Sequence, residues 1–258
     1  MIKTGYELSD SEIANKYSQI SDKVRLPMFF YYRVALFLGN LNGKKVLDCG
    51  CGNGFLLALL SKKNPSAVLF GIDPVKKFCK NAKNKLGNIA IIKQGSIYKV
   101  PFKNNFFDVI IVTEVLEHLK NPIKGLRELS RKIKKNGKII VTIPNGSAFN
   151  ATKKIGENTS SKILNYMLLP WEHPKKSIQP IDTLYDYDEI LDLFKRSGFR
   201  IKRVFGYDYF PYLYNIPKIN QIFSILLFPF FILLNYFPLY KYAYSIFFEI
   251  EKIDSKME

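Results

Sequence analysis

Short apolar segments alternate with helical patterns through the middle of the chain. The expected strands are 45–48, 67–73, 89–92, 107–112 and 137–143, and the expected helices between them are 55–61, 76–85 and 122–133. The segment 107–112 is apolar at nearly every position, as is typical of a strand that is covered on both faces. Strands that alternate with helices through short connections predict a doubly wound, mostly parallel α/β sheet.

The pattern changes on both sides of this core. Residues 5–40 have apolar positions near a period of 3.6, which predicts helices. Residues 146–185 are first polar and then proline-rich, and a connection longer than the fold needs is usually functional. We therefore expect a helical cap at 1–40, a core at 41–145, a substrate-side insertion at 146–185 and a completion of the sheet at 186–258.

The C-terminal region begins with a helix signal. Asp186 and Glu189 have the spacing of an N-terminal capping pair, and Gly198 is expected to end the helix. Strand patterns follow at 199–205 and 242–251. Between these two strands lies the run Ile219–Tyr240, which contains 22 residues and no charged side chain.

Composition and charge narrow the class of protein. Of 258 residues 47% are hydrophobic, which excludes a disordered chain, and three cysteines exclude a secreted disulfide framework. The start of the chain lacks the apolar run of a signal peptide, so a cytoplasmic location is expected. Residues 46–145 carry 18 basic and 6 acidic side chains, whereas the last 48 residues carry 4 of each. The net charge of +17 therefore lies mainly on the core. It suits an anionic membrane surface, nucleic acid or an acidic substrate, and the alternative is a lysine-rich solvated surface without a partner.

The sharpest signal is the segment 46–55, VLDCGCGNGF, in which glycine follows an expected strand at every second position. Its spacing fits neither the G-x-G-x-x-G motif of dinucleotide enzymes nor the phosphate loop that ends in Gly-Lys-Ser/Thr. Asp73 ends the second strand, where a carboxylate can accept both hydroxyls of a ribose. Asp48 ends the first strand and can accept an ammonium group. A ribose and an amino acid without a pyrophosphate indicate S-adenosylmethionine.

Together these motifs resemble those of the class I S-adenosylmethionine-dependent methyltransferases. The resemblance rests on D-x-G-x-G-x-G, on the acid that ends the second strand, and on FDVI at 107–110 followed by EVLEHL at 114–119. The branch it resembles most is that of ubiquinone and menaquinone biosynthesis. It implies a Rossmann-like, mostly parallel seven-stranded sheet whose last strand is antiparallel, with an apolar helical insertion before that strand.

The resemblance also implies which residues contact S-adenosylmethionine. The glycines line the methionine part, Asp73 holds the ribose, and the residue after Gly95 reads the adenine amine. That last residue is often Asp in the family, whereas this chain has Ser96, a poorer partner for an amine. The expected cofactor contacts are Asp48, Gly50, Cys51, Gly52, Asn53, Gly54, Asp73, Pro74, Ser96, Ile97, Thr113 and Glu114.

His118 is the candidate catalytic residue, because it is one of two histidines and follows the fourth strand at the ligand-binding edge. It would act as a general base if the methyl acceptor must lose a proton. Two alternatives stay open: His118 is structural, or it binds a divalent metal together with Glu114 and Glu117, as some quinone methyltransferases of this pattern are thought to do. No metal is included in our prediction.

The uncharged run 219–240 is long enough to cross a membrane, but Pro229 and Pro238 interrupt it. If 242–251 returns to the same sheet, as the resemblance implies, a single crossing is topologically impossible. We therefore expect an apolar helical hairpin at 216–240 on the ligand-binding edge, roofing the pocket or entering a bilayer. Burial inside the domain or in a dimer interface, and a true C-terminal anchor, are the alternatives.

We expect a methyltransferase that acts on a hydrophobic or lipid-linked small molecule of the quinone, isoprenoid or glycolipid type, at the inner face of the membrane. The first alternative is an RNA methyltransferase that uses the basic surface. This chain lacks the Asn/Asp-Pro-Pro-aromatic motif of enzymes that methylate base amines, since 113–116 reads TEVL. Methylation of base amines is therefore disfavoured, whereas methylation of an RNA ribose or ring carbon stays open. The second alternative is a cofactor-binding membrane scaffold without catalysis.

Overall fold

The computed structural model describes residues 8–20, 28–157, 181, 183–207, 226, 230 and 238–253. Seven strands form one sheet in the order β3-β2-β1-β4-β5-β7-β6. Their bounds are β1 Lys45–Cys49, β2 Val68–Asp73, β3 Ala90–Gln94, β4 Phe107–Thr113, β5 Ile133–Pro144, β6 Phe199–Tyr207 and β7 Ser245–Lys252. Only β7 runs antiparallel to its neighbours β5 and β6. The predicted mostly parallel sheet with an antiparallel last strand is confirmed.

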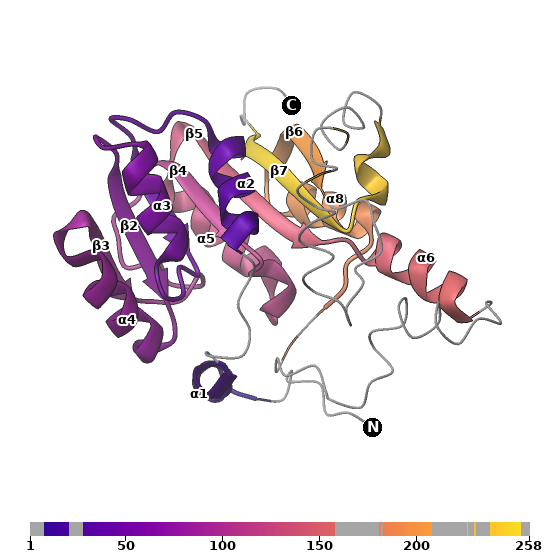
Figure 1. Cartoon of the computed structure of the whole chain (residues 1–258), viewed down its shortest axis with the longest axis horizontal. Helices are drawn as coiled ribbons and strands as arrows, with labels where there is room; N and C mark the ends of the chain where they lie inside the picture. The colour runs from indigo at the N-terminus through magenta and orange to yellow at the C-terminus, as the bar shows by residue number, and fades with distance from the viewer. Residues whose placement is uncertain are drawn as a thin grey trace.

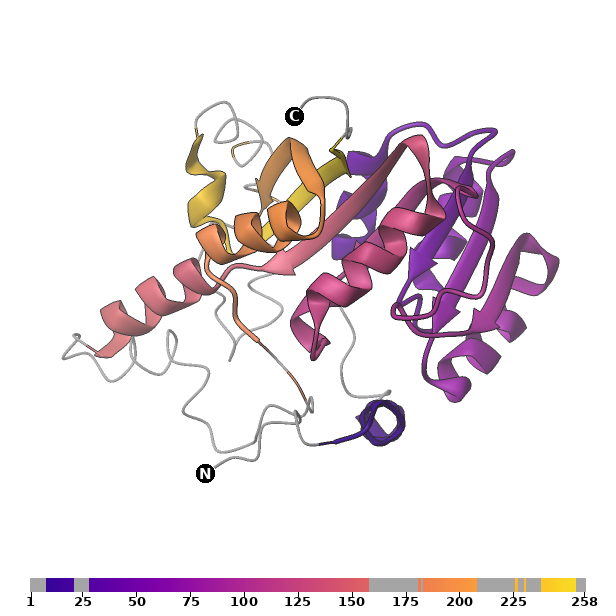
Figure 2. The ribbon, with the colours of Figure 1, turned by 180° about the vertical axis from the view of Figure 1, so that it is seen from behind.

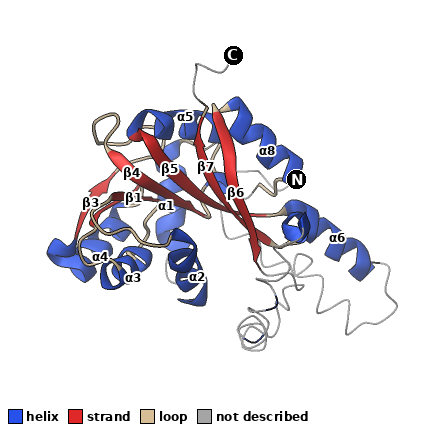
Figure 3. Cartoon of the chain, turned by 90° about the horizontal axis from the view of Figure 1, so that it is seen from above, coloured by secondary structure: helices blue, strands red, loops and turns tan. Residues whose placement is uncertain are grey.

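Helices cover both faces of this sheet. The helices are α1 Asp10–Ile20, α2 Met28–Leu38, α3 Phe55–Lys63, α4 Lys76–Leu86, α5 Pro122–Lys132, α6 Gly146–Glu157 and α8 Tyr187–Arg196. Figure 3 shows α2, α3 and α4 on one face and α5 and α8 on the other. Figure 2 shows α5 and α8 in front of the strands. Figure 1 shows α1 apart from these layers and α6 projecting from the far side of the sheet.

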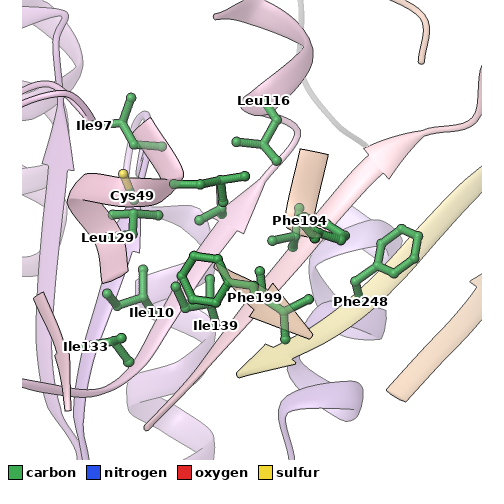
Figure 4. Packing of buried hydrophobic residues seen from close by; sticks show 14 of the residues in the cluster. Cys49, Ile97, Ile110, Leu116, Leu129, Ile133, Ile139, Phe194, Phe199 and Phe248 are labelled. Atoms are coloured by element: carbon green, nitrogen blue, oxygen red, sulfur yellow. The ribbon is translucent and has the colours of Figure 1, made fainter. Parts of the chain in front are cut away.

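Two apolar cores lie between the sheet and its two helical layers. One core joins α5 and α8 to the strands, and Figure 4 shows Ile110, Ile139 and Phe248 of the sheet beside Leu129 and Phe194 of these helices. The other core joins α2, α3 and α4 to the opposite face. Because both faces of the sheet are buried at β4, this strand is apolar at nearly every position, which explains why its sequence pattern was so clear.

The sequence predicted the helix ends better than the strand ends. Asp186 and Glu189 make the expected capping box at the start of α8. Strand β5 begins at Ile133 and not at 137, because the backbone of Ile133 already pairs with Phe107 across a register shift. Residues 238–242 form a 3₁₀ turn, so the last strand begins at Ser245, three residues after the expected start.

The insertion contains a helix that the sequence analysis did not predict. Residues 146–157, which were interpreted only as a polar insertion, form α6. The remainder of the insertion at 158–180 and most of the expected hairpin at 216–240 lie outside the described residues. Two positions of that hairpin, Leu226 and Phe230, are helical and have 68% and 50% of their surface exposed.

No helix in the described part of the chain is long and apolar enough to cross a membrane.

Charge is distributed unevenly along the sheet. Residues 49–107 build α3, β2, α4 and β3 and contain ten lysines and one acid, Asp73, which is buried. Helix α4 exposes five lysines, at 76, 77, 80, 83 and 85. The β3 end of the sheet is therefore strongly basic.

Candidate functional site

The loop between β1 and α3 turns through three glycines with positive φ. Gly50, Gly52 and Gly54 have φ values of 89°, 49° and 74°, a region that favours glycine. The backbone N–H of Gly50 donates to the carbonyl oxygen of Ile72 at 2.8 Å, which ties the loop to β2. A Cβ added at Gly50 would come within 2.6 Å of Val115 Cγ2. The loop therefore excludes side chains where the chain after β4 approaches it.

Asp73 fastens this loop from the end of β2. Its two carboxylate oxygens accept the backbone N–H groups of Gly52 and Val75, each at 2.9 Å. Burial raises the pKa of Asp73 to about 6, although the two backbone hydrogen bonds act in the opposite direction. The predicted ribose ligand is thus also the residue that holds the glycine loop in place, a role that its position alone did not indicate.

Asp48 lies beneath the same loop and is 2% exposed. Burial raises its pKa to about 7, and the neighbouring Asp73 carboxylate raises it further in the same direction. A carboxyl group with this pKa is poised between its neutral and charged forms near neutral pH. A cationic ligand beside Asp48 would favour the charged form.

Glu114 occupies an unusual backbone conformation at the end of β4. Its φ is 51°, which is uncommon for a residue other than glycine. The hydroxyl of Thr142 donates to the Glu114 carboxylate at 2.9 Å and accepts the Glu114 backbone N–H at 3.1 Å. Strained residues held by their surroundings cluster at functional sites, and β5 holds this one. Its neighbour Thr113 is buried, and within the described residues its hydroxyl has no hydrogen-bond partner.

Tyr31 reaches the site from α2 and was not predicted from the sequence. Its ring stacks on that of Phe55, with centroids 6.2 Å apart. Burial raises the pKa of Tyr31 to about 12, and the carboxylates of Asp48 and Glu114 raise it as well. The phenol is therefore a neutral hydrogen-bond donor in an acidic surrounding. No motif marks it, since it lies in the aromatic-rich run MFFYY at 28–32.

The remaining predicted loop residues have distinct surroundings. Cys51 is buried, and burial raises the pKa of its thiol above its ordinary value. The side chain of Asn53 accepts a hydrogen bond from Asn81 of α4 at 2.9 Å. Ile97 belongs to the apolar core on the α5 side and lies next to Gly125. Its predicted contact with the cofactor stays a prediction.

His118 lies in a short 3₁₀ turn, Leu116–His118, after β4. Its Nδ1 atom is 2.9 Å from the carbonyl oxygen of Ile181, and the backbone N–H of Thr183 donates to the Glu117 carbonyl oxygen. Burial lowers the pKa of His118 to about 4. The imidazole is therefore neutral at ordinary pH, with its hydrogen on Nδ1 and an acceptor lone pair on Nε2, which lies 3.7 Å from Glu117 Oε1. The end of the insertion thus docks on the candidate base.

Helix α1 closes the site from the N-terminal side. The hydroxyl of Tyr17 donates to the carbonyl oxygen of Ile181 at 3.2 Å, and its ring centroid is 5.7 Å from that of His118. Lys120 donates a hydrogen bond to the carbonyl oxygen of Leu8, just before the helix. Helix α1 and the end of the insertion therefore meet at the candidate catalytic histidine.

A groove with a volume of about 570 Å³ opens between α1 and the ends of β2 and β3. Pro74 and Ser96, two of the predicted cofactor contacts, line it together with residues of α1 and α4. Its lining residues are Ser11, Ala14, Asn15, Ser18, Pro74, Val75, Lys76, Lys77, Gln94, Gly95 and Ser96. The predicted adenine end of the site is therefore an accessible surface.

The three residues of the alternative metal site make other contacts in the described part of the chain. In the described part of the chain, no group of three or more His, Cys, Asp or Glu side chains is placed to hold a metal ion. Glu114 is instead bonded to Thr142, and Glu117 lies beside His118 with its backbone joined to Thr183. The base, structural and metal interpretations of His118 stay predictions.

The topology and the glycine loop define the class of protein: an α/β domain that binds a nucleoside cofactor at the carboxyl ends of its parallel strands. Residues 47–141 match the family model described as a methyltransferase domain. Residues 47–141 therefore carry a methyltransferase domain, with S-adenosylmethionine as the cofactor.

Relatives with different substrates share parts of the sequence. A demethylmenaquinone methyltransferase of Thermotoga maritima is 24% identical over 73% of this chain and 85% of its own length. A tRNA U34 carboxymethyltransferase of Nautilia profundicola is 34% identical over 40% of this chain and 35% of its own length. The chain spans 37%, 48% and 65% of three other curated relatives that it matches.

The fold recurs in solved structures. The crystal structure of magnesium protoporphyrin IX methyltransferase from Synechocystis PCC 6803 with bound SAH has a TM-score of 0.56 and 16% identity. The match covers 93% of this chain and 94% of that one. At this identity the likeness establishes the shared fold.

The residues present fit the cofactor. The space above Gly52 is open, since an added Cβ would meet nothing within 4 Å. Thr113 offers a buried hydroxyl without a partner among the described residues, and Asp48 and Glu114 offer carboxylates for an ammonium group. Asp73 would hold the ribose. When bound, S-adenosylmethionine supplies a methyl group that is already activated for transfer.

Proposed function

We propose that this protein methylates a hydrophobic or lipid-linked small molecule at a membrane face. The observation that carries the proposal is the position of the two strands that the uncharged run 219–240 connects. Strand β6 ends at Tyr207 and β7 begins at Ser245, and the two strands are antiparallel neighbours. The chain between them therefore leaves and returns at one edge, the edge that carries the glycine loop.

The exposed side chains near this connection support an apolar partner. Leu226, Phe230 and Tyr242 have 68%, 50% and 60% of their surface exposed. Large apolar side chains that are this exposed favour contact with a bilayer or with a hydrophobic substrate. The lysines of α4 would add attraction to anionic headgroups, so a peripheral position at the inner, cytoplasmic face of the membrane belongs to the same proposal.

The site residues would act mainly by binding and orientation. Tyr31, Asp48 and Glu114 surround the amino-acid end of the cofactor, while Asp73 keeps the glycine loop in place. Holding donor and acceptor in line accounts for much of the rate enhancement in such transfers. His118 Nε2 would accept the proton of an acceptor hydroxyl or amine, with Nδ1–H held by Ile181. The insertion and α1 would exclude water there.

One relative supports the substrate class. Of the relatives described above, it is the one that matches over the largest share of both lengths. The demethylmenaquinone methyltransferase of Thermotoga maritima is, by its name, an enzyme of quinone chemistry. A quinone with an isoprenoid tail is a hydrophobic, membrane-borne acceptor, as the apolar connection requires.

RNA is the second candidate substrate, and the basic end of the sheet favours it. Residues 74–107 contain eight lysines and no acid, and the relative from Nautilia profundicola is a tRNA enzyme by name. Phosphate contacts through lysine make binding steeply dependent on salt. A lipid substrate would not require such a dependence for the transfer itself.

Labelled S-adenosylmethionine distinguishes these candidates directly. The protein is incubated with the labelled cofactor and either a membrane lipid extract or total RNA. We expect label in the lipid fraction; label in RNA alone supports the second candidate. Label in neither fraction, with the cofactor bound, would indicate a cofactor-binding scaffold and contradict the proposal.

Flotation with liposomes that contain anionic lipid tests the membrane contact. We expect the wild type to float and the variant Leu226→Glu/Phe230→Glu to stay in the soluble fraction. The matched control is Val68→Glu/Ile253→Glu, which adds the same two charges at exposed positions on the edge of the sheet opposite the glycine loop. Equal flotation of the wild type and the Leu226→Glu/Phe230→Glu variant would refute contact through this connection.

A further inference from the structure

The groove at the end of β2 and β3 has a chemical peculiarity. An adenine ring presents an amine, which needs a hydrogen-bond acceptor, beside a ring nitrogen, which needs a donor. None of the residues that line the groove is acidic. The position after Gly95, from which an acid would reach the amine, holds Ser96. The amine therefore lacks a strong acceptor at this position, and another residue of the groove would strengthen its recognition.

Helix α1 turns a polar stripe toward this groove. Ser11, Ala14, Asn15 and Ser18 all line it, and their spacing is that of one helical face. Tyr17 lies on a different face of the same helix, where its hydroxyl contacts Ile181. One face of α1 therefore borders the groove, while another contacts the turn at His118.

Most polar side chains of the groove are already engaged. The Gln94 amide donates to the carbonyl oxygen of Pro74 at 3.0 Å. The Ser96 hydroxyl accepts the backbone N–H of Tyr98 at 3.2 Å.

The serines of α1 are engaged as well. Ser18 donates to the backbone carbonyl oxygen of Asn15 at 2.7 Å, and Ser11 shares a hydrogen bond with Ser9 at 3.0 Å. The side-chain amide of Asn15 has no hydrogen-bond partner among the described residues and is exposed to the groove. Its carbonyl oxygen and both N–H groups are therefore available, whereas the Gln94 amide has one N–H engaged with Pro74.

We propose that Asn15 recognises the adenine base of the cofactor from α1. Its carbonyl oxygen accepts the exocyclic amine, and its NH₂ group donates to the adjacent ring nitrogen, the two-bond pattern by which Asn pairs with adenine. This amide takes over the task for which Ser96 is a weak partner. The inference rests on S-adenosylmethionine binding and is independent of the methyl acceptor proposed above.

Binding to two homocysteine derivatives tests the assignment. S-adenosylhomocysteine carries the amine, whereas S-inosylhomocysteine has in its place a carbonyl oxygen, which cannot donate to the carbonyl oxygen of Asn15. Calorimetry should show that the wild type prefers the adenosyl compound. We expect Asn15→Ala to lose about tenfold affinity for the adenosyl compound, about 1.4 kcal/mol, and to change little toward the inosyl compound.

The controls separate recognition from helix stability. Gln19→Ala changes an exposed residue of α1 outside the groove and should leave both affinities unchanged. Asn15→Asp keeps the acceptor but not the donor, so it should retain part of the preference. An equal loss for both compounds, or no loss, would overturn the role of Asn15. If neither compound bound the wild type, the cofactor assignment would fail and this proposal with it, whatever the methyl acceptor.

Discussion

The Nδ1 atom of His118 lies 2.9 Å from the carbonyl oxygen of Ile181, which also accepts the hydroxyl hydrogen of Tyr17 at 3.2 Å. One carbonyl of the insertion thus joins the turn after β4 to helix α1. A carbonyl oxygen can only accept, so both partners must donate to it. The contact sets the tautomer of His118 and directs Nε2 as the acceptor.

The first prediction concerns the pH dependence of methyl transfer. Burial lowers the pKa of His118 to about 4, so His118 is already neutral at pH 5. At saturating cofactor, kcat should show no rise through pH 6.5, where an ordinary histidine titrates. A stopped assay of methyl incorporation from pH 5 to 8 measures this. A rise centred near 6.5 that disappears in His118→Gln would contradict the neutral, buried imidazole.

The second prediction concerns cofactor affinity and Asp48. Burial raises the pKa of Asp48 to about 7, so at pH 6 the carboxyl is mostly protonated before binding. The ammonium group of the cofactor favours the carboxylate, so affinity should rise with pH between about 6 and 8 and binding should release protons. Calorimetry in two buffers of different ionisation enthalpy counts those protons. Asp48→Asn should bind more weakly at pH 8 and lose the pH dependence.

The third prediction concerns stability without cofactor. Both Asp48 and Asp73 have folded-state pKa values raised above the ordinary 3.8, to about 7 and about 6. Between about pH 4 and 7 the folded state therefore binds more protons at these groups than the unfolded state. Their contribution to the free energy of unfolding must fall as pH rises through that window.

The matched variant isolates this contribution from that of His118, whose lowered pKa acts in the opposite direction. Asp48→Asn cannot titrate, so its free energy of unfolding should fall less steeply than that of the wild type between pH 4 and 7. One proton of difference corresponds to about 1.4 kcal/mol per pH unit. Parallel urea-unfolding curves at four pH values should show it, and identical slopes would be inconsistent with a raised pKa.

The fourth prediction concerns the anchor of the glycine loop. Asp73→Ala removes the acceptor of two backbone N–H groups, those of Gly52 and Val75. We expect more than a tenfold loss of S-adenosylmethionine affinity, at least about 1.4 kcal/mol. Calorimetry checks the affinity. The midpoint temperature of thermal unfolding should also fall, because each unsatisfied buried donor costs about 1–3 kcal/mol. Unchanged affinity would refute the site assignment.

The fifth prediction compares two glycines with similar backbone conformation. Gly50 has φ 89° and would place a Cβ 2.6 Å from Val115, whereas Gly39 has φ 70° and open space around it. Gly50→Ala should destabilise the protein by about 1–3 kcal/mol more than Gly39→Ala, because only the former adds a steric clash. Denaturant unfolding measures both. Adding Val115→Ala should recover part of the loss at Gly50 and none at Gly39.

The sequence predicted the sheet because its signals are local. Apolar runs such as 107–112 and the glycine pattern at 50–54 are read within a few residues of each other. The capping pair Asp186 and Glu189 is likewise three residues apart, and the structure contains it. The same reasoning placed Asp48 and Asp73 at the strand ends, where the parallel sheet brings them together.

The parts that were missed depend on contacts between distant segments. Tyr31 enters the site because α2 covers the face of β1, and an apolar run gives no sign of that. The positive φ of Glu114 is imposed by Thr142 of the next strand, 28 residues further on. Helix α6 formed in a segment whose polar composition resembles that of a loop.

The lysines of residues 49–107 lie at the β3 end of the sheet, while the C-terminal 48 residues, which include β7 at the opposite end, have no net charge. Such a separation gives the molecule a large electric dipole across the width of the sheet. Near any anionic surface a torque would act on this dipole over about one Debye length, some 8–10 Å in ordinary salt. The protein would therefore be oriented, with the β3 end of its sheet toward the anionic surface, before any of its atoms made contact with that surface.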